Sequence, residues 1–285
     1  MGANVKTKIF YILNYMFFTL LVLVMVYPLW YMLMISLSSS TKMSANIYYL
    51  TPNGFTLKVY KQLLSDPLIF SGYKNSLIVT LMGTAISLFL TVTTAYPLSK
   101  NNLSGRKYIM SFIMFTMLFN GGMIPTFLVV RSFGLVNSLW ALIFLGAISV
   151  YNTMVMIKFF KNIPVELIES AYIDGYNDIA VLIKIVLPLS KAVLAAIGLF
   201  YAVGKWNAFL PGLIYLNDVK KWPIQVILYS FLSSLNMIEE SGSLEATSEA
   251  YRMATAVIAV LPIVMVYPFL QKYFVKGIML GSVKG

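Results

Sequence analysis

The sequence predicts an all-α, polytopic membrane protein, and three observations carry that prediction. The 285 residues are 59% hydrophobic and only 11% charged, which is typical of membrane proteins. Six apolar segments reach the roughly 20 residues that an α-helix needs to cross a hydrocarbon core of about 30 Å. Lys and Arg occur singly or in pairs between these segments, as expected for loops beside anionic lipid head groups.

The apolar segments and the polar stretches between them give the predicted order of the chain. One transmembrane domain, about 77–275, follows a first span and a long outer loop. The expected pieces are a cytoplasmic N-terminus at 1–8, spans at 9–37, 77–98, 108–130, 138–157, 192–216 and 253–275, extracellular loops at 38–76 and 217–252, a cytoplasmic loop at 159–191 and a cytoplasmic tail at 276–285.

Charge sets the expected orientation. Lys6 and Lys8 precede the first span, and basic residues favour the cytoplasmic side. Twelve Lys and Arg fall on the pieces expected inside and eight on those expected outside, a moderate bias. An even number of spans then returns the C-terminus to the cytoplasm. The first apolar segment is longer than the 7–15 residue core of a signal peptide, so we expect it to be an uncleaved span.

Composition excludes several function classes. The chain has no Cys, so disulfides, thiolate metal sites and cysteine nucleophiles are ruled out. It has no His, which removes the usual proton shuttle at neutral pH and the commonest metal ligand. The net charge of +11 is dispersed and forms no basic stripe or arm, so it does not indicate nucleic-acid binding.

The cytoplasmic loop 159–191 holds four of the ten acidic residues of the chain, Glu166, Glu169, Asp174 and Asp178. Pro164 fits the first turn of a short helix, with Asn162 as its cap and the two glutamates near its positive end. Val165, Ile168 and Tyr172 share one face of that helix, with Ala171 beside them.

Gly175 is expected to stop this helix, because glycine accepts the left-handed conformation of a helix C-terminus. A second apolar helix, about 179–187, is expected to end at Pro188. Two interpretations of the pair remain open on periodicity alone. It can be a connector that lies on the membrane surface, or a docking element whose apolar face enters a groove of a cytoplasmic protein.

The stretch "ESAYIDGYNDIAVLIKIVLPLSK" resembles the signature loop of ABC-importer membrane subunits, which runs E-A-A-x-x-x-G and ends near I-x-L-P. The positions that match are Glu169, Ala171, Asp174, Gly175, Ile185, Leu187 and Pro188, and those that depart are Ser170, Tyr176, Leu182 and Ala192. The resemblance extends over most of the chain, through "GGMIPTFLVVRSFGLVNSLWALI", "LFYAVGKWNAFLPGLIYL" and "YPFLQKYFVKGIMLGSVKG". These stretches resemble the carbohydrate, maltose-type branch, and within it the complex-oligosaccharide and polysaccharide permeases of Gram-positive bacteria.

The resemblance implies a type I importer permease with a cytoplasmic coupling helix that contacts an ATPase. The implied coupling residues are Glu166, Glu169, Ala171, Asp174, Gly175 and Pro188. No G-x-x-x-x-G-K-[ST] motif occurs, so ATP and Mg²⁺ would belong to a partner and this chain would be neither an enzyme nor a cofactor protein. The implied partners are a second homologous permease, two ATP-binding subunits and an extracellular solute-binding lipoprotein that delivers an oligosaccharide and meets loop 217–252.

Lys205 is the only ionisable residue of its predicted span and lies near the middle of it. A charge there costs about 2.5–3.5 kcal/mol on insertion scales. Two interpretations stay open: Lys205 faces water or the carbonyls of a neighbouring helix, or it lines the sugar path with Trp206 and Asn207 and favours an acidic saccharide.

Two other classes of protein are weighed against an importer permease. An ion-coupled secondary transporter, the main alternative, would show an inverted repeat and several ionisable residues at the midplane, and neither is visible. A membrane enzyme is less favoured still, because the spans lack His, Cys and clustered carboxylates.

Overall fold

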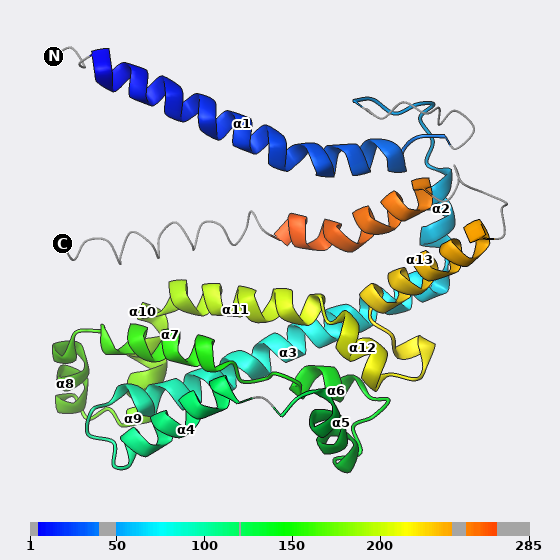
Figure 1. Cartoon of the computed structure of the whole chain (residues 1–285). Coiled ribbons are helices and arrows are strands. Elements are labelled where there is room, and N and C mark those ends of the chain that lie inside the picture. The colour runs from blue at the N-terminus through cyan, green and yellow to red at the C-terminus, as the bar shows by residue number, and fades with distance from the viewer. Residues whose placement is uncertain (1–4, 40–49, 120, 241–248, 267–285) are drawn as a thin grey trace. The chain divides into compact units, whose positions relative to one another are not determined.

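The computed structural model describes residues 5–39, 50–119, 121–240 and 249–266, and helices make up most of these ranges (Figure 1). Within these ranges the only strand-like pairing is an isolated bridge between Ser38 and Phe55. The chain divides into two compact units, 1–69 with 228–261 and 70–227 with 262–285. The predicted all-α class is confirmed.

The first unit holds α1 (Val5–Ser36), α2 (Lys58–Ser65) and most of the helix Glu249–Val266. Most side chains of α1 are exposed and apolar, as a helix that faces lipid requires. At its end, Met34 and Ile35 are buried, and the partly buried Met253 packs against them. Two buried side chains one turn apart, Val59 and Leu63, make α2 amphipathic.

The second unit contains most of the other helices. They are α3 (Pro67–Ser99), α4 (Arg106–Leu118), α5 (Met123–Ser132), α6 (Leu139–Phe144), α7 (Val150–Lys161), α8 (Val165–Ile173), α9 (Asp178–Val181), the π-helical turn η2 (Leu182–Val186), α10 (Leu187–Leu189), α11 (Lys191–Trp206), α12 (Phe209–Tyr215), the 3₁₀ turn η3 (Val219–Lys221) and α13 (Ile224–Glu240). The long helices α3 and α13 each cross the boundary between the units.

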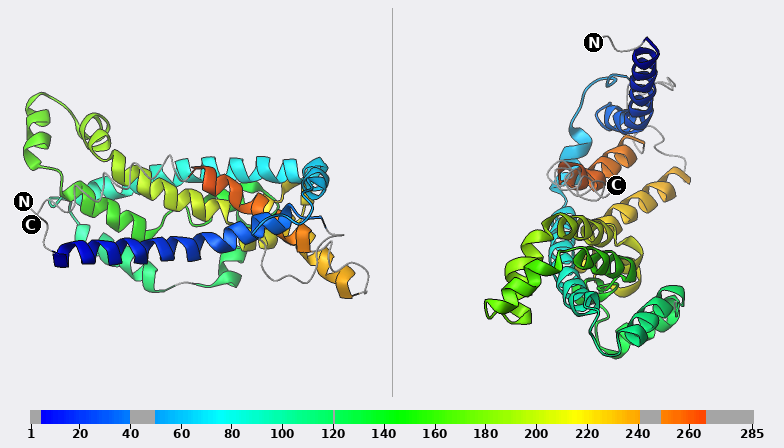
Figure 2. Two further views of the ribbon diagram at one scale, coloured as in Figure 1. Left: turned by 90° about the horizontal axis from the view of Figure 1, so that it is seen from above. Right: turned by 90° about the vertical axis from the view of Figure 1, so that its left-hand side faces the viewer.

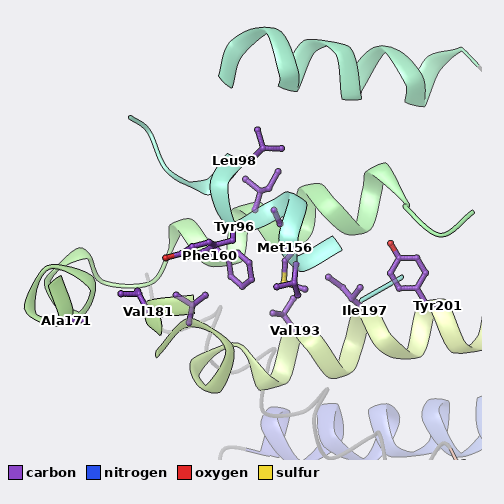
Figure 3. Packing of buried hydrophobic residues seen from close by; sticks show 13 residues of the cluster. Tyr96, Leu98, Met156, Phe160, Ala171, Val181, Val193, Ile197 and Tyr201 are labelled. Atoms are coloured by element: carbon purple, nitrogen blue, oxygen red, sulfur yellow. The ribbon is translucent and has the colours of Figure 1, made fainter. Parts of the chain in front are cut away.

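Two apolar clusters form the core of the second unit. The larger one joins α3, α7 and α11 to the short helices α8 and α9, and these three longer helices lie alongside one another (Figures 2 and 3). Its buried side chains include Ala95, Met156, Ala171, Val181 and Ile197. The smaller cluster joins α6 and α12 to α3 and α5 around Leu142 and Tyr215. The segment from α8 to α10 is therefore packed onto the core and is not a loose connector.

Three helices in the described residues are long and apolar enough to cross a membrane: Thr7–Ser36, Pro67–Ser99 and Glu249–Val266. Two bent pairs also pass the same test, Arg106–Leu118 with Met123–Ser132 and Asp178–Leu189 with Lys191–Trp206. The end of the predicted sixth span, 267–275, lies outside the described residues. The predicted second span begins earlier than expected, because Pro67 suits a first helical turn and Asp66 Oδ1 accepts a hydrogen bond from the Leu68 amide at 2.8 Å.

The segments predicted as the fourth and fifth spans are not continuous helices. The fourth is broken between α6 and α7, where Gly146 has a φ of 66° and Ser149 caps α7 by accepting from the Asn152 amide at 3.3 Å. The fifth is broken between α11 and α12, where Ala208, with φ −72° and ψ 60°, centres a tight turn closed by the Phe209 amide on the Asn207 carbonyl at 2.7 Å. Lys205 consequently lies in the last turn of α11, not in the middle of one long helix.

Tyr201 of α11 links three helices at the first of these breaks. Its hydroxyl oxygen lies 2.8 Å from Thr91 Oγ1 of α3 and accepts a hydrogen bond from the Ser149 amide, at the start of α7, at 3.0 Å. The side chain is 6% exposed. The Ser149 amide precedes α7 and has no acceptor within that helix, so the buried Tyr201 hydroxyl supplies its hydrogen bond.

We predict that Tyr201→Phe destabilises the protein by about 1–3 kcal/mol, because the Ser149 amide and Thr91 hydroxyl lose their buried partner. Thermal unfolding of the purified protein in detergent measures the change. The matched control is Tyr108→Phe, whose side chain is 82% exposed and which should stay within about 0.5 kcal/mol of wild type. Equal effects of the two substitutions would contradict the role given to Tyr201.

Candidate functional site

The cytoplasmic loop predicted at 159–191 forms a structured segment, α8 to α10, which we call the coupling segment (residues 164–190). Its first helix, α8, begins directly after Pro164 and has no side-chain cap. The prediction that Asn162 caps α8 is wrong. Asn162 is instead the C-cap of α7, because α7 extends to Lys161 and uses this residue for its own end.

Gly175 ends α8 as predicted. The Tyr176 amide donates to the Ala171 carbonyl at 2.9 Å, and the Gly175 amide donates to the Tyr172 carbonyl at 3.0 Å, which together make a Schellman motif. Gly175 has a φ of 83°, and no atom lies within 4 Å of the position that a Cβ would take. Backbone strain, not lack of space, is therefore what disfavours other residues here.

The two faces of α8 differ in exposure. Ala171 is 2% exposed and packs into the larger core cluster, with Ile168 partly buried beside it. On the outer side, Ile173 is 86% exposed, and Glu166 and Glu169 are exposed near the positive end of the helix. Helix α8 thus packs on the core through Ala171 and Ile168 and presents an apolar and acidic surface outward.

A polar cluster ties the coupling segment to the end of α3. Lys100, just after α3, forms an ion pair with Asp178 of α9 and donates to the Tyr172 hydroxyl of α8 at 2.8 Å. The Tyr172 hydroxyl in turn donates to Asp178 Oδ1 at 2.5 Å. The Lys100 ammonium also lies 4.8 Å from the centre of the Tyr96 ring. The Lys100 ammonium therefore contacts residues of three helices, α3, α8 and α9.

The pKa values of this cluster shift in the direction that keeps both charges. Hydrogen bonds from Lys100 and then Tyr172 lower the pKa of Asp178. Burial acts to lower the pKa of Lys100, but the hydrogen bonds to Asp178 and Tyr172 outweigh it, and the pKa is raised. Sequence reasoning noted Asp178 as acidic but missed this cluster, since Lys100 is far from Tyr172 and Asp178 in the chain.

The second half of the coupling segment runs further than predicted. The helical stretch Asp178–Leu189 includes Pro188 and then meets α11 at a bend of 83°. The wide turn η2 precedes the proline, with the Leu187 amide bonded to the Leu182 carbonyl. Pro188 has no backbone N–H and so cannot donate a helical hydrogen bond. It follows directly after the wide π-helical turn. The helix therefore ends at Leu189 and the change of direction occurs at Ser190.

Lys205 turns toward the carbonyls of a broken helix, which is the first of its two interpretations. Its ammonium donates to the carbonyls of Leu142, Ile143 and Leu145 at 2.9, 2.8 and 2.7 Å. These carbonyls close the last turn of α6, the negative end of that helix. A Cβ on Gly83 of α3 would lie 3.1 Å from the lysine stem, so glycine gives this side chain its room. Lys205 is 7% exposed.

A pocket of about 400 Å³ opens beside the break between α6 and α7. Lys205 and Asn207 line it, and Trp206 does not. The Trp206 ring lies near that of Tyr73 in α3, with ring centres 6.1 Å apart. The structure thus brings two of the three predicted path residues to one pocket and directs the third into helix packing. Other lining residues that sequence reasoning missed are Ser149, Asn152, Phe200 and Tyr201.

No cluster of three or more His, Cys, Asp or Glu that could hold a metal ion occurs in the part of the chain that the structure describes. The polar groups of the two regions are amides, hydroxyls, lysines and separate carboxylates. Such groups bind a partner surface or a hydroxylated ligand by hydrogen bonds.

Comparison with known proteins gives consistent matches. A sequence model of the family described as "Binding-protein-dependent transport system inner membrane component" matches residues 83–280. The polygalacturonan/rhamnogalacturonan transport system permease protein YtcP of Bacillus subtilis (strain 168) is 43% identical, over 98% of this chain and 100% of that protein. Protein LplC of the same organism is 42% identical, over 98% of this chain and 96% of its own length.

A solved structure also matches almost the whole chain. It is the crystal structure of a bacterial ABC transporter involved in the import of the acidic polysaccharide alginate, with a TM-score of 0.86 and 33% sequence identity. The match covers 96% of this chain and 99% of that one. The likeness is therefore one of the whole fold and not of one motif.

We predict that Lys205→Met destabilises the protein by about 2–4 kcal/mol, because three carbonyls at the end of α6 lose their donor. Lys205→Arg keeps a cation with several donors and should recover part of the loss. Thermal unfolding in detergent measures both variants. If Lys205→Met unfolds at the wild-type temperature, the carbonyls do not depend on this side chain.

We predict a small, pH-dependent coupling between Lys100 and Asp178. A double-mutant cycle with Lys100→Met and Asp178→Asn should give about 0.2–1 kcal/mol, the range for exposed pairs. Because the pKa of folded Asp178 is lowered, the coupling is complete above the ordinary carboxyl pKa of about 3.9 and is lost as the pH falls through the lowered value. A coupling that grows toward acid pH would contradict the assignment.

Proposed function

This chain belongs to the family of binding-protein-dependent transport system inner membrane components, and we propose that it couples a separate ATPase to the import of an acidic oligosaccharide. It is a membrane permease subunit of a carbohydrate ABC importer. The observation that carries the coupling role is the coupling segment itself, an outward helix with an acidic and apolar surface that is tied to the core at both ends. No observation favours an ion-coupled transporter.

The proposed coupling site is the exposed side of α8 and the turn after it. Glu166, Glu169 and Asp174 offer carboxylates to a cytoplasmic partner, and Ile173 offers an apolar contact. A rigid helix transmits displacement where a flexible linker would absorb it. Ala171 and Pro188 support this role by packing α8 on the core and by directing the chain into α11.

The proposed partners follow from the family and from what this chain lacks. With no phosphate-binding loop in the sequence, ATP and Mg²⁺ belong to ATP-binding subunits, two in the assembly, and a second homologous permease completes the pathway. An extracellular solute-binding lipoprotein delivers the saccharide to the outer loops. The orientation that this requires places both termini in the cytoplasm, in agreement with the distribution of Lys and Arg.

The substrate class is proposed from the relatives and from charge. One relative is named for polygalacturonan and rhamnogalacturonan, and the related structure concerns import of the acidic polysaccharide alginate. In this chain the stretch 205–207 is the proposed part of the path, with Lys205 as a fixed positive charge and Asn207 at the pocket wall. Trp206 supports the path from behind through its packing on Tyr73.

We predict that Glu169→Lys and Gly175→Val each abolish ATP-driven uptake while the chain still inserts into the membrane. Glu169→Lys reverses the charge of the proposed docking surface, and Gly175→Val forces a β-branched residue into a left-handed position. Uptake in proteoliposomes and co-purification of the ATPase measure the effects. Gly175→Asn is the control, since asparagine tolerates this conformation and should retain uptake. Normal uptake in Glu169→Lys and Gly175→Val would refute the coupling role of α8.

A further inference from the structure

The pocket beside the broken fourth span has the side chains that a saccharide site needs. The Asn152 amide of α7 lines it, and this residue is only 5% exposed. Within the described part of the chain its side chain makes no hydrogen bond. Its backbone amide donates to Ser149 Oγ. The Asn152 side-chain amide opens onto the pocket, where water or a ligand can satisfy it. It is therefore available to a hydroxylated ligand in this pocket.

Other groups at the pocket wall fit the same ligand. Phe200 lines the pocket and is 51% exposed, so an apolar ring face is available for stacking. Asn207 adds a second side-chain amide, and Ser149 adds a hydroxyl whose oxygen accepts from the backbone amide of Asn152 and which still has a proton to donate. The volume of about 400 Å³ lies within the roughly 300–1,000 Å³ of small-molecule sites.

The electrostatics of the pocket select an anion. Lys205 borders it, and its ammonium donates to three carbonyls and, among the described residues, to no carboxylate. Carbonyl dipoles satisfy the three protons but leave the net charge of +1 in place, and no Asp or Glu lines the pocket. In a site of low dielectric constant that charge favours an anionic ligand in the pocket without a direct contact.

We propose that this pocket is a binding subsite for an acidic sugar unit, located within this subunit, in which Asn152 is the central specificity residue. The subsite rests on the proposed import function and deepens it. Asn152 and Asn207 hydrogen-bond ring hydroxyls, Phe200 stacks on the apolar ring face, and the field of Lys205 attracts the carboxylate. Lys205 acts at a distance, because all of its protons are already committed to α6.

The test compares an anionic and a neutral probe of nearly the same shape. The assembled importer, with its partner permease, ATPases and binding protein, is reconstituted in liposomes, and uptake of digalacturonate and of the neutral digalactose is measured. Asn152→Asp keeps the size of the side chain and adds a negative charge. We expect it to raise the KM for digalacturonate at least about tenfold relative to that for digalactose, because like charges then meet in the pocket.

Two further variants separate this effect from misfolding and from coupling. Asn152→Leu removes the hydrogen bonds without a charge and should raise the KM for both probes by similar factors. Asn162→Asp makes the same change as Asn152→Asp at the exposed cytoplasmic end of α7 and should leave the ratio of the two KM values unchanged. Each variant uses the same binding protein, so a changed ratio originates in this chain. Phe200→Leu supplies a second variant of the pocket, with weaker uptake of both probes expected.

The outcomes distinguish the subsite from the import function on which it rests. If the wild-type importer takes up digalacturonate and Asn152→Asp leaves the KM ratio unchanged, the subsite is refuted and import stands. Uptake of digalactose alone overturns the acidic substrate class and the subsite with it. If neither probe enters in an ATP-dependent way, the proposed function fails as well.

Discussion

The arrangement of the second unit depends on one constraint: a helix broken inside an apolar medium exposes amides and carbonyls that only other protein groups can satisfy. The fourth predicted span carries such a break between α6 and α7. Two side chains one turn apart on α11 meet the need. Lys205 donates to the carbonyl end of α6, and Tyr201 accepts from the amide at the start of α7. A cation at the negative end and an acceptor at the positive end match the polarity of the two helices.

The same helix connects this break to the coupling segment. Helix α11 follows the bend at Ser190, so its first residue adjoins the short helices α8 to α10 and its last turn contacts α6. Lys100 fixes the other side of the coupling segment to the end of α3. Helix α8 is therefore connected to the pocket through packed helices and two polar contacts, not through a free linker. This continuity gives a mechanical reason for placing a substrate subsite next to the break.

Sequence reasoning reached the parts of this architecture that local rules determine. The helical class follows from hydrophobicity, and the Gly175 stop follows from the tolerance of glycine for the left-handed conformation. The breaks within the fourth and fifth spans were not predicted. Hydropathy measures the apolar content of a segment and does not report where its helical hydrogen bonds are interrupted. The pocket was missed for a related reason. Asn152 looks like an ordinary polar residue near the end of a span until its neighbours across the fold are known.

The two positive charges that matter most, Lys100 and Lys205, illustrate how environment assigns different tasks to one residue type. Lys100 lies just after α3 beside the Asp178 carboxylate, so the two charges of the pair cancel and the effect of Lys100 is local and structural. Lys205 lies among carbonyls and has no carboxylate partner in the described part of the chain, so no neighbour there neutralises the charge of this pocket-lining residue. Burying a charge carries a large desolvation penalty, so a neutral hydrogen-bond donor would suit a purely structural contact better than a buried lysine. Retaining the cation at such a site is consistent with a use for its field, which the selectivity of the pocket for an acidic sugar would provide.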